Sequence, residues 1–580
     1  MTDLAPSVIT TKTADCQDCY RCVRECIPKA IQVRDGHASV HPERCVLCGH
    51  CVGVCPVGAK QVRNDLLRAQ TLLLQREQVY VSLAPSFVGQ YSGISPFAVV
   101  AGIKRLGFAG VSETALGAEL VAARETASEK HSSQPIISSA CPAVVELVRK
   151  YYPELTDWLS PTLSPALAHA KMLRELYGQE IGVVFVSPCI AKKREADAHP
   201  ELIDVAITFE DLDAWFEQTG TRLQTLDDFN GQFVPWRARG GTSLPLEGGM
   251  IGAMDAGRKR SAKRPLRLAV SGLPHVREVL DELRGESRPE PHFLELLACD
   301  GGCVNGPKTR RAGKLSRARA VRNWMAAAPK EQPQEMPTID LATGFVAAPL
   351  EVRHHSDTTI REALSQIGKY QSQDELNCGS CGYSSCREFA AAYVDGDAEQ
   401  TMCVGHMRKI AQKKTDALLR AMPSAVAIVD RDLMIRECNE RFARLAGEEA
   451  QLLFDAKPGL EGISVKDLIP FWELFRQALF EQDQLIDREF THQGRVISAS
   501  VFVVEEGSMV GGVFQDITEP SVHRERIITR AEEVIHKNLS TVQQIAHLMG
   551  ENAAETEALL SSIIGAFGSS EDTGGGERIR

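Results

Sequence analysis

Sixteen of the 17 cysteines fall into four sets of four thiols, and such sets hold metal. Two sets are compact C-x2-C-x2-C-x3-C runs, and a third has the spacing C-x2-C-x4-C-x16-C. The fourth is scattered over the middle of the chain. Four thiolates complete one 4Fe–4S cluster, so the sequence predicts a protein that moves or senses electrons. The sets are Cys16, Cys19, Cys22 and Cys26; Cys45, Cys48, Cys51 and Cys55; Cys378, Cys381, Cys386 and Cys403; and Cys141, Cys189, Cys299 and Cys303.

The two compact runs resemble the bacterial two-cluster ferredoxin pattern, in which the fourth cysteine of each run serves the other cluster. This resemblance implies two clusters, each held by three cysteines of one run and the fourth cysteine of the other run. Zinc also takes four thiolates, but zinc sites rarely show two interlocked runs of this kind. The implied ligand sets are Cys16, Cys19, Cys22 and Cys55 for the first cluster, and Cys45, Cys48, Cys51 and Cys26 for the second.

The scattered cysteines follow short apolar runs in a region whose pattern is typical of an α/β fold. Runs such as VYVSLAP and IGVVFVSPC alternate with helical stretches. Alpha/beta folds build sites from loops at strand ends. Gly301 and Gly302 let the backbone between Cys299 and Cys303 approach a cluster closely. The alternative is a set of buried structural cysteines beside a glycine-rich turn.

Three segments of this region, SSACP, SPCIAKKRE and ELLACDGGCVNG, resemble the signature motifs of the di-iron (FeFe) hydrogenases. The resemblance implies an H-cluster, which is a 4Fe–4S cubane joined to a di-iron site that carries CO and cyanide. It assigns the cubane to the scattered cysteines, with Cys303 as the bridge to the di-iron site.

The same resemblance implies roles for four neighbouring residues. Lys192 matches the motif lysine, whose ammonium suits a cyanide ligand or a bridging amine, and Glu195 matches the glutamate that fixes it. Ala84 and Pro85 are implied to shape the pocket. Without the motif, Lys192 and Glu195 are a solvated i,i+3 pair.

Several motif positions depart from the family pattern. Ala140 stands where catalytic members have a cysteine that carries protons, and Ser187 and Leu297 replace motif methionines. An ungapped comparison places Leu120 and Ala123 where the family has proton-relay carboxylates, with Glu119 and Glu125 nearby but off register. Because the ligands are kept and the proton path is broken, we expect slow hydrogen turnover and a detector function.

The second half of the chain resembles a small single-cluster domain followed by a PAS sensor domain. The segment CGSCGYSSCREFA carries the third cysteine set, for which zinc is the alternative metal. The leftover Cys438 is expected to be a core residue rather than a ligand. Apolar residues at three- and four-residue steps predict a helix over 522–549 that contacts a partner or a second copy, or folds back on the PAS sheet.

We therefore predict a multidomain α/β and α+β protein. Its cofactors are two ferredoxin-type 4Fe–4S clusters, an H-cluster and a further 4Fe–4S cluster. The expected parts are a two-cluster ferredoxin domain at 8–70, an FeFe-hydrogenase H-cluster domain at 78–310, a linker or surface segment at 311–360, a 4Fe–4S domain at 361–408, a PAS domain at 412–519, C-terminal helices at 520–567 and a disordered tail at 568–580.

Composition restricts the location and the partners. The net charge of −11 argues against nucleic acid, and no apolar run is long enough to span a bilayer. Many thiols without an export signal predict a reducing cytoplasm. Expected partners are H2 and protons, an electron-transfer protein, a downstream kinase, phosphatase or regulator, and a second copy. The rival functions are a catalytic hydrogenase with a regulatory PAS tail and a non-enzymatic iron–sulfur protein that lacks the di-iron site.

Overall fold

The computed structural model describes residues 7–129, 134–226, 230–256, 265–285, 292–309, 313–331, 336–351, 353–480, 485–518, 534, 535 and 537. The chain divides into two compact units, Met1–Cys403 and Val404–Arg580. The architecture confirms the predicted multidomain fold with α/β and ferredoxin-like parts and a PAS domain. The helices expected at 520–567 and the tail at 568–580 lie outside the described residues, apart from three isolated positions.

The N-terminal module consists of two short antiparallel pairs and two one-turn helices. Asp35 and Gly36 both have positive φ, 53° and 79°, which is what a tight hairpin turn requires. Tyr20 and Gly49 also have left-handed backbone conformations, and each is the residue that precedes one of the two helices. The elements are β1 (Ile9–Thr11) with β4 (Lys60–Val62), β2 (Ile31–Arg34) with β3 (His37–Val40), α1 (Arg21–Arg24) and α2 (His50–Val54).

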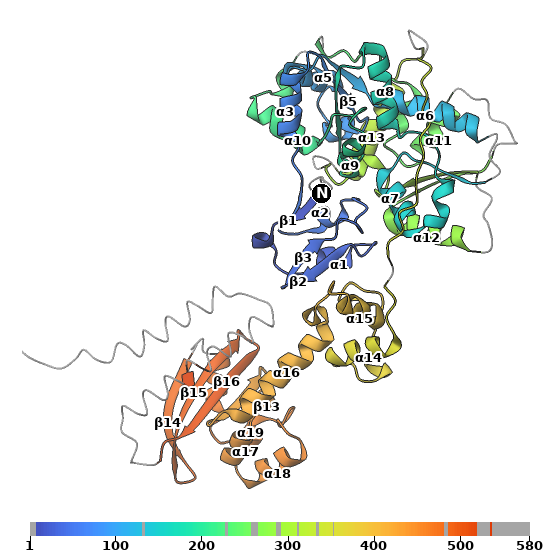
Figure 1. Ribbon diagram of the computed structural model, residues 1–580. Coiled ribbons are helices and arrows are strands. Elements are labelled where there is room, and N and C mark those ends of the chain that lie inside the picture. The colour runs from blue at the N-terminus through green and yellow to red at the C-terminus, as the bar shows by residue number, and fades with distance from the viewer. Residues whose placement is uncertain are drawn as a thin grey trace, which may run out of the picture. The chain divides into compact units, whose positions relative to one another are not determined.

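The central region contains two parallel sheets. The first has the strand order β6-β5-β8-β9, and every residue of these strands is buried, as expected for a parallel sheet with both faces covered. The second has the order β10-β11-β7. Figure 1 shows helices around β5 on both sides. The strands are β5 (Val79–Leu83), β6 (Gly110–Glu113), β7 (Ile136–Ile137), β8 (Gly182–Ser187), β9 (Val205–Thr208), β10 (Arg267–Ser271) and β11 (Phe293–Leu297).

Amphipathic helices cover these sheets and connect consecutive parallel strands, as parallel topology requires. Proline stands in the first turn of several of them, where its missing N–H leaves no helical hydrogen bond unmade. The helices are α3 (Leu66–Gln75), α4 (Phe87–Gln90), α5 (Pro96–Arg105), α6 (Ala115–Ser128), α7 (Pro142–Tyr151), α8 (Pro165–Tyr177), α9 (Ala191–Ala198), α10 (Phe209–Gln218), α11 (Gly249–Asp255) and α12 (Leu273–Arg284).

The segment expected to be a linker at 311–360 instead begins with a helix that belongs to the α/β core. Helix α13 (Lys314–Ala326) buries Val321 and Trp324, and the indole Nε1 of Trp324 donates to Glu113 Oε1 at 2.8 Å. The guanidinium of Arg237 lies 3.5 Å from the centre of the Trp324 ring. This part of the segment is therefore a helix docked through two apolar residues and not a linker, while Lys314, Arg319 and Arg322 stay exposed.

The following extended segment, residues 341–350, packs along the α/β domain. Leu163 N donates to Leu341 O at 2.9 Å and Thr343 N donates to Pro161 O at 3.1 Å. Farther on, Arg149 Nε donates to Val346 O at 2.7 Å. This part of the expected linker is therefore held to the domain by hydrogen bonds to its backbone.

The small cysteine-containing domain comprises α14 (Asp357–Gln366) and α15 (Cys386–Val394) and contacts the N-terminal module. Val33 N donates to Asp397 O at 2.8 Å, and Arg44 forms an ion pair with the buried Asp397 carboxylate. A Cβ on Gly382 would lie 3.0 Å from Arg24 N, so the two backbones approach closely. One continuous apolar cluster contains cysteines of all four sets, including Cys22, Cys51, Cys141 and Cys386.

The second unit is built on a five-stranded antiparallel sheet of order β13-β12-β16-β15-β14. Asn439 joins its first elements: its side chain accepts from Val426 N and donates to Ser424 O and Leu419 O. Cys438 is buried in the apolar core, as expected. The elements are α16 (Val404–Ala421), β12 (Ala425–Asp430), β13 (Ile435–Cys438), α17 (Glu440–Ala446), α18 (Glu448–Ala456), α19 (Val465–Leu468), α20 (Glu473–Phe480), β14 (Leu485–His492), β15 (Arg495–Glu505) and β16 (Met509–Asp516).

Within the part of the chain that the structure describes, no helix has the length and hydropathy needed to cross a membrane.

Candidate functional site

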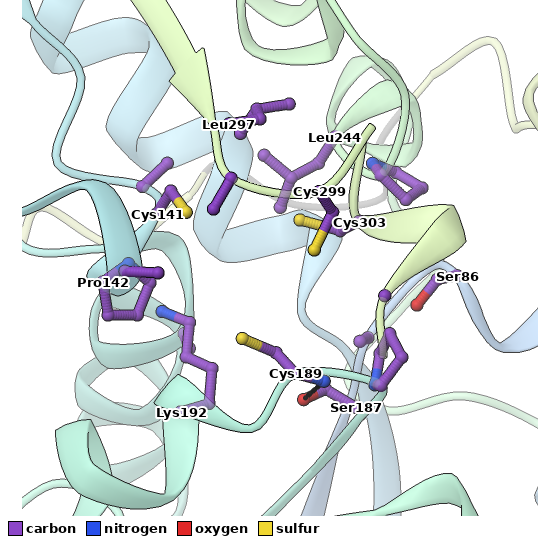
Figure 2. Close-up of a pocket in the computed structure, with 18 of the residues that line it drawn as sticks. Ser86, Cys141, Pro142, Ser187, Cys189, Lys192, Leu244, Leu297, Cys299 and Cys303 are labelled. Carbon is purple, nitrogen blue, oxygen red and sulfur yellow. Dashed lines mark hydrogen bonds between the residues drawn. The ribbon is translucent and has the colours of Figure 1, made fainter. Parts of the chain in front are cut away.

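The four scattered cysteines meet at one cavity, although they come from three separate loops (Figure 2). Cys141 precedes α7, Cys189 follows β8, and Cys299 and Cys303 follow β11 on either side of the Gly301-Gly302 turn. The space not filled by protein atoms is about 840 Å³, including a part open to solvent. The loops of two parallel sheets therefore build a single pocket with four thiols in its wall.

Three thiols of this wall, those of Cys189, Cys299 and Cys303, are strongly desolvated. Burial, with a smaller contribution from Cys141, raises the pKa of Cys189 to about 11, and burial raises the pKa of Cys299 and of Cys303 still further. Such thiols stay protonated unless a cation replaces their protons, and a coordinating metal deprotonates a thiol outright. Four thiols around one space therefore fit an iron–sulfur cluster, whose iron ions supply the missing positive charge.

Lys192, on α9, reaches the same cavity. Its Nζ lies 2.5 Å from Glu195 Oε2 and 2.9 Å from Ser164 Oγ. The side chains of Lys192 and Glu195 are only 10% and 11% exposed, which excludes the alternative of a solvated pair. The structure thus brings a fixed ammonium group to the cysteine pocket.

The neighbouring Lys193 faces away from the pocket and has a structural function. Its Nζ lies 3.0 Å from carboxylate oxygens of both Asp65 and Asp211, and the lysine and Asp65 are 1% exposed. Burial alone would raise the pKa of Asp65, but Lys193 and two arginines hold that pKa below its usual value. These contacts connect α9 to the start of α3 and to α10.

We expect Lys193→Met to reduce the free energy of unfolding by about 3–5 kcal/mol, because it leaves two carboxylates without their buried cation. Denaturant titration of the anaerobic protein measures this loss. Lys192→Met is the matched variant: it should alter the spectrum of any group bound in the cavity, while Lys193→Met should not. Equal spectral effects of the two variants would contradict the division of roles.

The other expected pocket residues also line the cavity: Ala84, Pro85, Ala140, Ser187 and Leu297. Two hydroxyl residues of the lining, Ser86 and Thr114, were missed from the sequence. Ser86 Oγ is buried and has no hydrogen-bond partner among the described residues. Ser86 directly follows Ala84-Pro85 and could have been found there, whereas nothing in the sequence marks Thr114.

The two carboxylates that the ungapped comparison placed off register, Glu119 and Glu125, have different surroundings in the structure. Glu125, considered off register, is completely buried, and Ser160 Oγ donates to its carboxylate. Ser160 also lies 3.0 Å from Thr162 Oγ1, and burial raises the pKa of Glu125. Glu119 instead accepts hydrogen bonds from Arg239 N and Gly241 N. Of these two carboxylates, Glu125 is therefore the buried one with a raised pKa, whereas Glu119 is held by backbone N–H groups.

The ferredoxin-like module borders the cavity through its second cysteine run. Leu47 and Cys48 line the cavity, and a Cβ on Gly49 would lie 2.6 Å from Ile190 Cδ1 and from Pro307 Cγ. The negative charge of a Cys48 thiolate contributes to the raised pKa of Cys299. The two cysteine sets are thus within electrostatic range of each other.

The remaining thiols also lie close enough to influence one another electrostatically. Cys22 is under the electrostatic influence of Cys16, Cys19 and Cys55, and Cys51 is under that of Cys48, Cys45 and Cys26. Cys381 is influenced by Cys403 and Cys378, and Cys386 is buried in the same domain. The ligand assignments within these groups stay predictions.

Comparison with known families agrees with the cysteine sets. Residues 77–307 match the family "iron only hydrogenase large subunit, C-terminal domain", and residues 15–59 match a 4Fe–4S dicluster domain. Residues 374–404 match a putative Fe–S cluster domain and residues 413–487 a PAS domain. The chain is therefore a multidomain protein with a hydrogenase domain of the iron-only type, as the motifs indicated.

Similar proteins include two hydrogenases. The chain is 27% identical over 382 residues to the NADP-reducing hydrogenase subunit HndD of Solidesulfovibrio fructosivorans, covering 54% of this chain and 64% of the relative. It is 25% identical over 378 residues to iron hydrogenase 1 of Clostridium pasteurianum, covering 48% and 65%. The chain thus spans just under two thirds of these relatives. An FeFe-hydrogenase structure from Chlamydomonas reinhardtii is 18% identical, with a TM-score of 0.39, over 50% of this chain and 100% of that one.

Proposed function

We propose that this protein is a cytoplasmic hydrogen sensor of the FeFe-hydrogenase type, with low turnover, that signals through its PAS domain. The observation that carries the proposal is the meeting of Cys141, Cys189, Cys299 and Cys303 with the buried Lys192 at one cavity. The four thiols would hold the cubane, with Cys303 as the bridge. When bound, the H-cluster supplies the metal centre at which hydrogen binds and is split or formed.

The chain's own residues then determine what this centre can do. Lys192 lines the cavity, and its hydrogen bonds to Glu195 and Ser164 keep its ammonium in place there, with a third N–H left to donate to a bound ligand. The apolar wall, which includes Ala84, Pro85 and Leu297, keeps water away from the group that the cavity holds. Ala140 offers no proton donor or acceptor, so protons lack a positioned carrier at this point of the wall.

The sensing function is supported by the combination of two features in one chain. Loss of the thiol at position 140 lowers turnover, and a PAS domain gives the site a way to affect another protein. Electrons would be exchanged with a separate electron-transfer protein. The output would pass to a kinase, phosphatase or regulator, or through a second copy bound at the PAS domain and C-terminal helix.

A catalytic hydrogenase with a regulatory PAS tail is the second candidate, and the buried Glu125 beside Ser160 favours it. Infrared spectra of the maturated protein, hydrogen turnover, and hydrogen exchange of the PAS amides under H2 and under N2 test the candidates. Metal-bound CO and cyanide bands, slow turnover and an H2-dependent change in PAS protection support the sensor. Fast turnover without that change supports the catalytic candidate, and missing bands support a non-enzymatic iron–sulfur protein.

Anaerobic reconstitution without the di-iron site should give about sixteen irons per chain, because each of the four thiol sets can hold one cubane. Cys378→Ser should remove about four of these irons and leave the infrared bands of the maturated protein unchanged. Iron analysis and electron paramagnetic resonance measure both effects. Zinc bound at the Cys378 set would show that this domain does not hold an iron–sulfur cluster.

A further inference from the structure

A chain of buried polar side chains leads away from the cavity wall at Thr114. Thr114 Oγ1 lies 2.8 Å from Ser82 Oγ, and Ser82 Oγ lies 2.7 Å from His169 Nδ1. The other ring nitrogen, His169 Nε2, lies 2.8 Å from Ser112 Oγ. All four residues are at most 2% exposed. The cavity is therefore connected to an internal network of three hydroxyls and one imidazole.

The fold brings these side chains together at one place. Ser82 and Ser112 are paired across the parallel strands β5 and β6, and α8 carries His169 over them. A Cβ on Gly117 of α6 would lie only 2.6 Å from His169 Cβ, so a glycine permits α6 to pack against the histidine. Buried polar groups are costly unless they are hydrogen-bonded. Every hydroxyl and both ring nitrogens here have a partner, so the network is satisfied internally.

The imidazole of His169 is neutral at physiological pH, because burial lowers its pKa to about 3. A neutral imidazole has one N–H donor and one acceptor nitrogen. If Nδ1 carries the proton, Nδ1 donates to Ser82, Ser82 donates to Thr114, and the Thr114 hydroxyl is left to donate into the cavity. If Nε2 carries the proton, every hydrogen bond of the network is reversed: Nε2 donates to Ser112, Ser82 donates to Nδ1, and Thr114 donates to Ser82. Thr114 then offers only its oxygen lone pairs to the cavity. The tautomer of His169 therefore sets the polarity of the cavity wall.

The chemistry of the cavity selects between the two arrangements. Under the proposed function, on which this step rests, the bound group presents CO and cyanide, which accept hydrogen bonds and donate none. A hydroxyl beside such ligands is useful only as a donor. Ser86, another hydroxyl of the cavity lining, is buried without a partner among the described residues and is likewise able to donate.

We propose that Thr114 donates a hydrogen bond to a CO or cyanide ligand in the cavity, and that Ser82, Ser112 and the Nδ1–H tautomer of His169 hold its hydroxyl in the donating direction. Thr114 is then a binding residue of the site, and His169 is a positioning residue that acts through Ser82. In this arrangement Ser112 donates to Nε2, so no hydrogen bond of the network is lost.

The test compares infrared spectra of the maturated full-length protein with those of Thr114→Val and Thr114→Ser. Thr114→Val keeps the shape of the side chain without its hydroxyl and should shift at least one CO or cyanide band. Thr114→Ser keeps the hydroxyl and should give the wild-type bands. Ser82→Ala removes the hydroxyl that donates to Thr114 Oγ1 and should shift the same band in the same direction, which covers the case in which Thr114→Val does not fold.

Nitrogen-15 NMR of histidine-labelled protein gives a second reading that does not depend on maturation. It should show His169 protonated at Nδ1, and protonation at Nε2 would overturn the proposal. Wild-type bands that are unchanged in Thr114→Val and Ser82→Ala would overturn it too, with the proposed function intact. Absence of CO and cyanide bands from the maturated wild type would overturn the proposed function and this inference together.

Discussion

Replacement of Ala140 by cysteine is expected to raise the rate of hydrogen turnover by about a hundred- to ten-thousand-fold, which is the usual effect of a positioned proton carrier. Ala140 lines the cavity at the point where α7 begins. The new thiol would lie in the wall of the cavity, and Glu125, a buried carboxyl group with a raised pKa, is the candidate to take the proton further. Turnover is measured after identical maturation, with infrared band intensity as the measure of site occupancy.

Two further variants separate proton transfer from a change in packing. Ala140→Ser adds a group of similar size that is a much weaker acid, and it should restore less activity than Ala140→Cys. Glu125→Gln should remove most of the gain in the Ala140→Cys background, because the amide cannot take up and release the proton. A wild type that already turns over rapidly, together with no change in rate on Ala140→Cys, would contradict the sensor hypothesis.

The cysteine sets could be predicted from the sequence because metal ligation fixes residue type and spacing. The scattered set could be recognised only from the sequence motifs around each cysteine, because Cys141 and Cys303 are far apart in the chain and only the strand-end loops bring them together. Lys192 was found in the same way. Its neighbour Lys193 has the same side chain but a structural function, and only its burial against Asp65 and Asp211 reveals this.

Other features depended on contacts that leave no local pattern. Helix α13 was missed because its basic composition is typical of a solvated segment. Its long basic side chains can keep their charged ends in water, while Val321 and Trp324 provide the apolar contacts. The network of Ser82, Ser112 and His169 combines residues from β5, β6 and α8, each of which is ordinary in its own segment. Tertiary contacts, not local propensity, give these residues their function.

Gly302→Ala is expected to remove the bound group from the cysteine pocket while the other clusters remain. Gly302 has φ 97° and ψ −179°, a conformation essentially restricted to glycine, which costs another residue about 1–3 kcal/mol. A Cβ at this position would also lie 2.5 Å from Pro245 O and 2.8 Å from Glu247 N, so backbone would have to move. The residue that moves with it is Cys303, the implied bridge to the di-iron site.

Gly93→Ala is the matched control, because Gly93 has a similar φ of 88° but no atom within 4 Å of the place that a Cβ would occupy. The control isolates the cost of the left-handed backbone from the cost of the collision. Gly93→Ala should therefore keep the full iron content and the infrared bands, whereas Gly302→Ala should lose the bands and about four cubane irons, those of the H-cluster. Retention of wild-type bands in Gly302→Ala would show that the loop between Cys299 and Cys303 can shift without losing its cluster, and that the close backbone contact with residues 245–247 does not position Cys303.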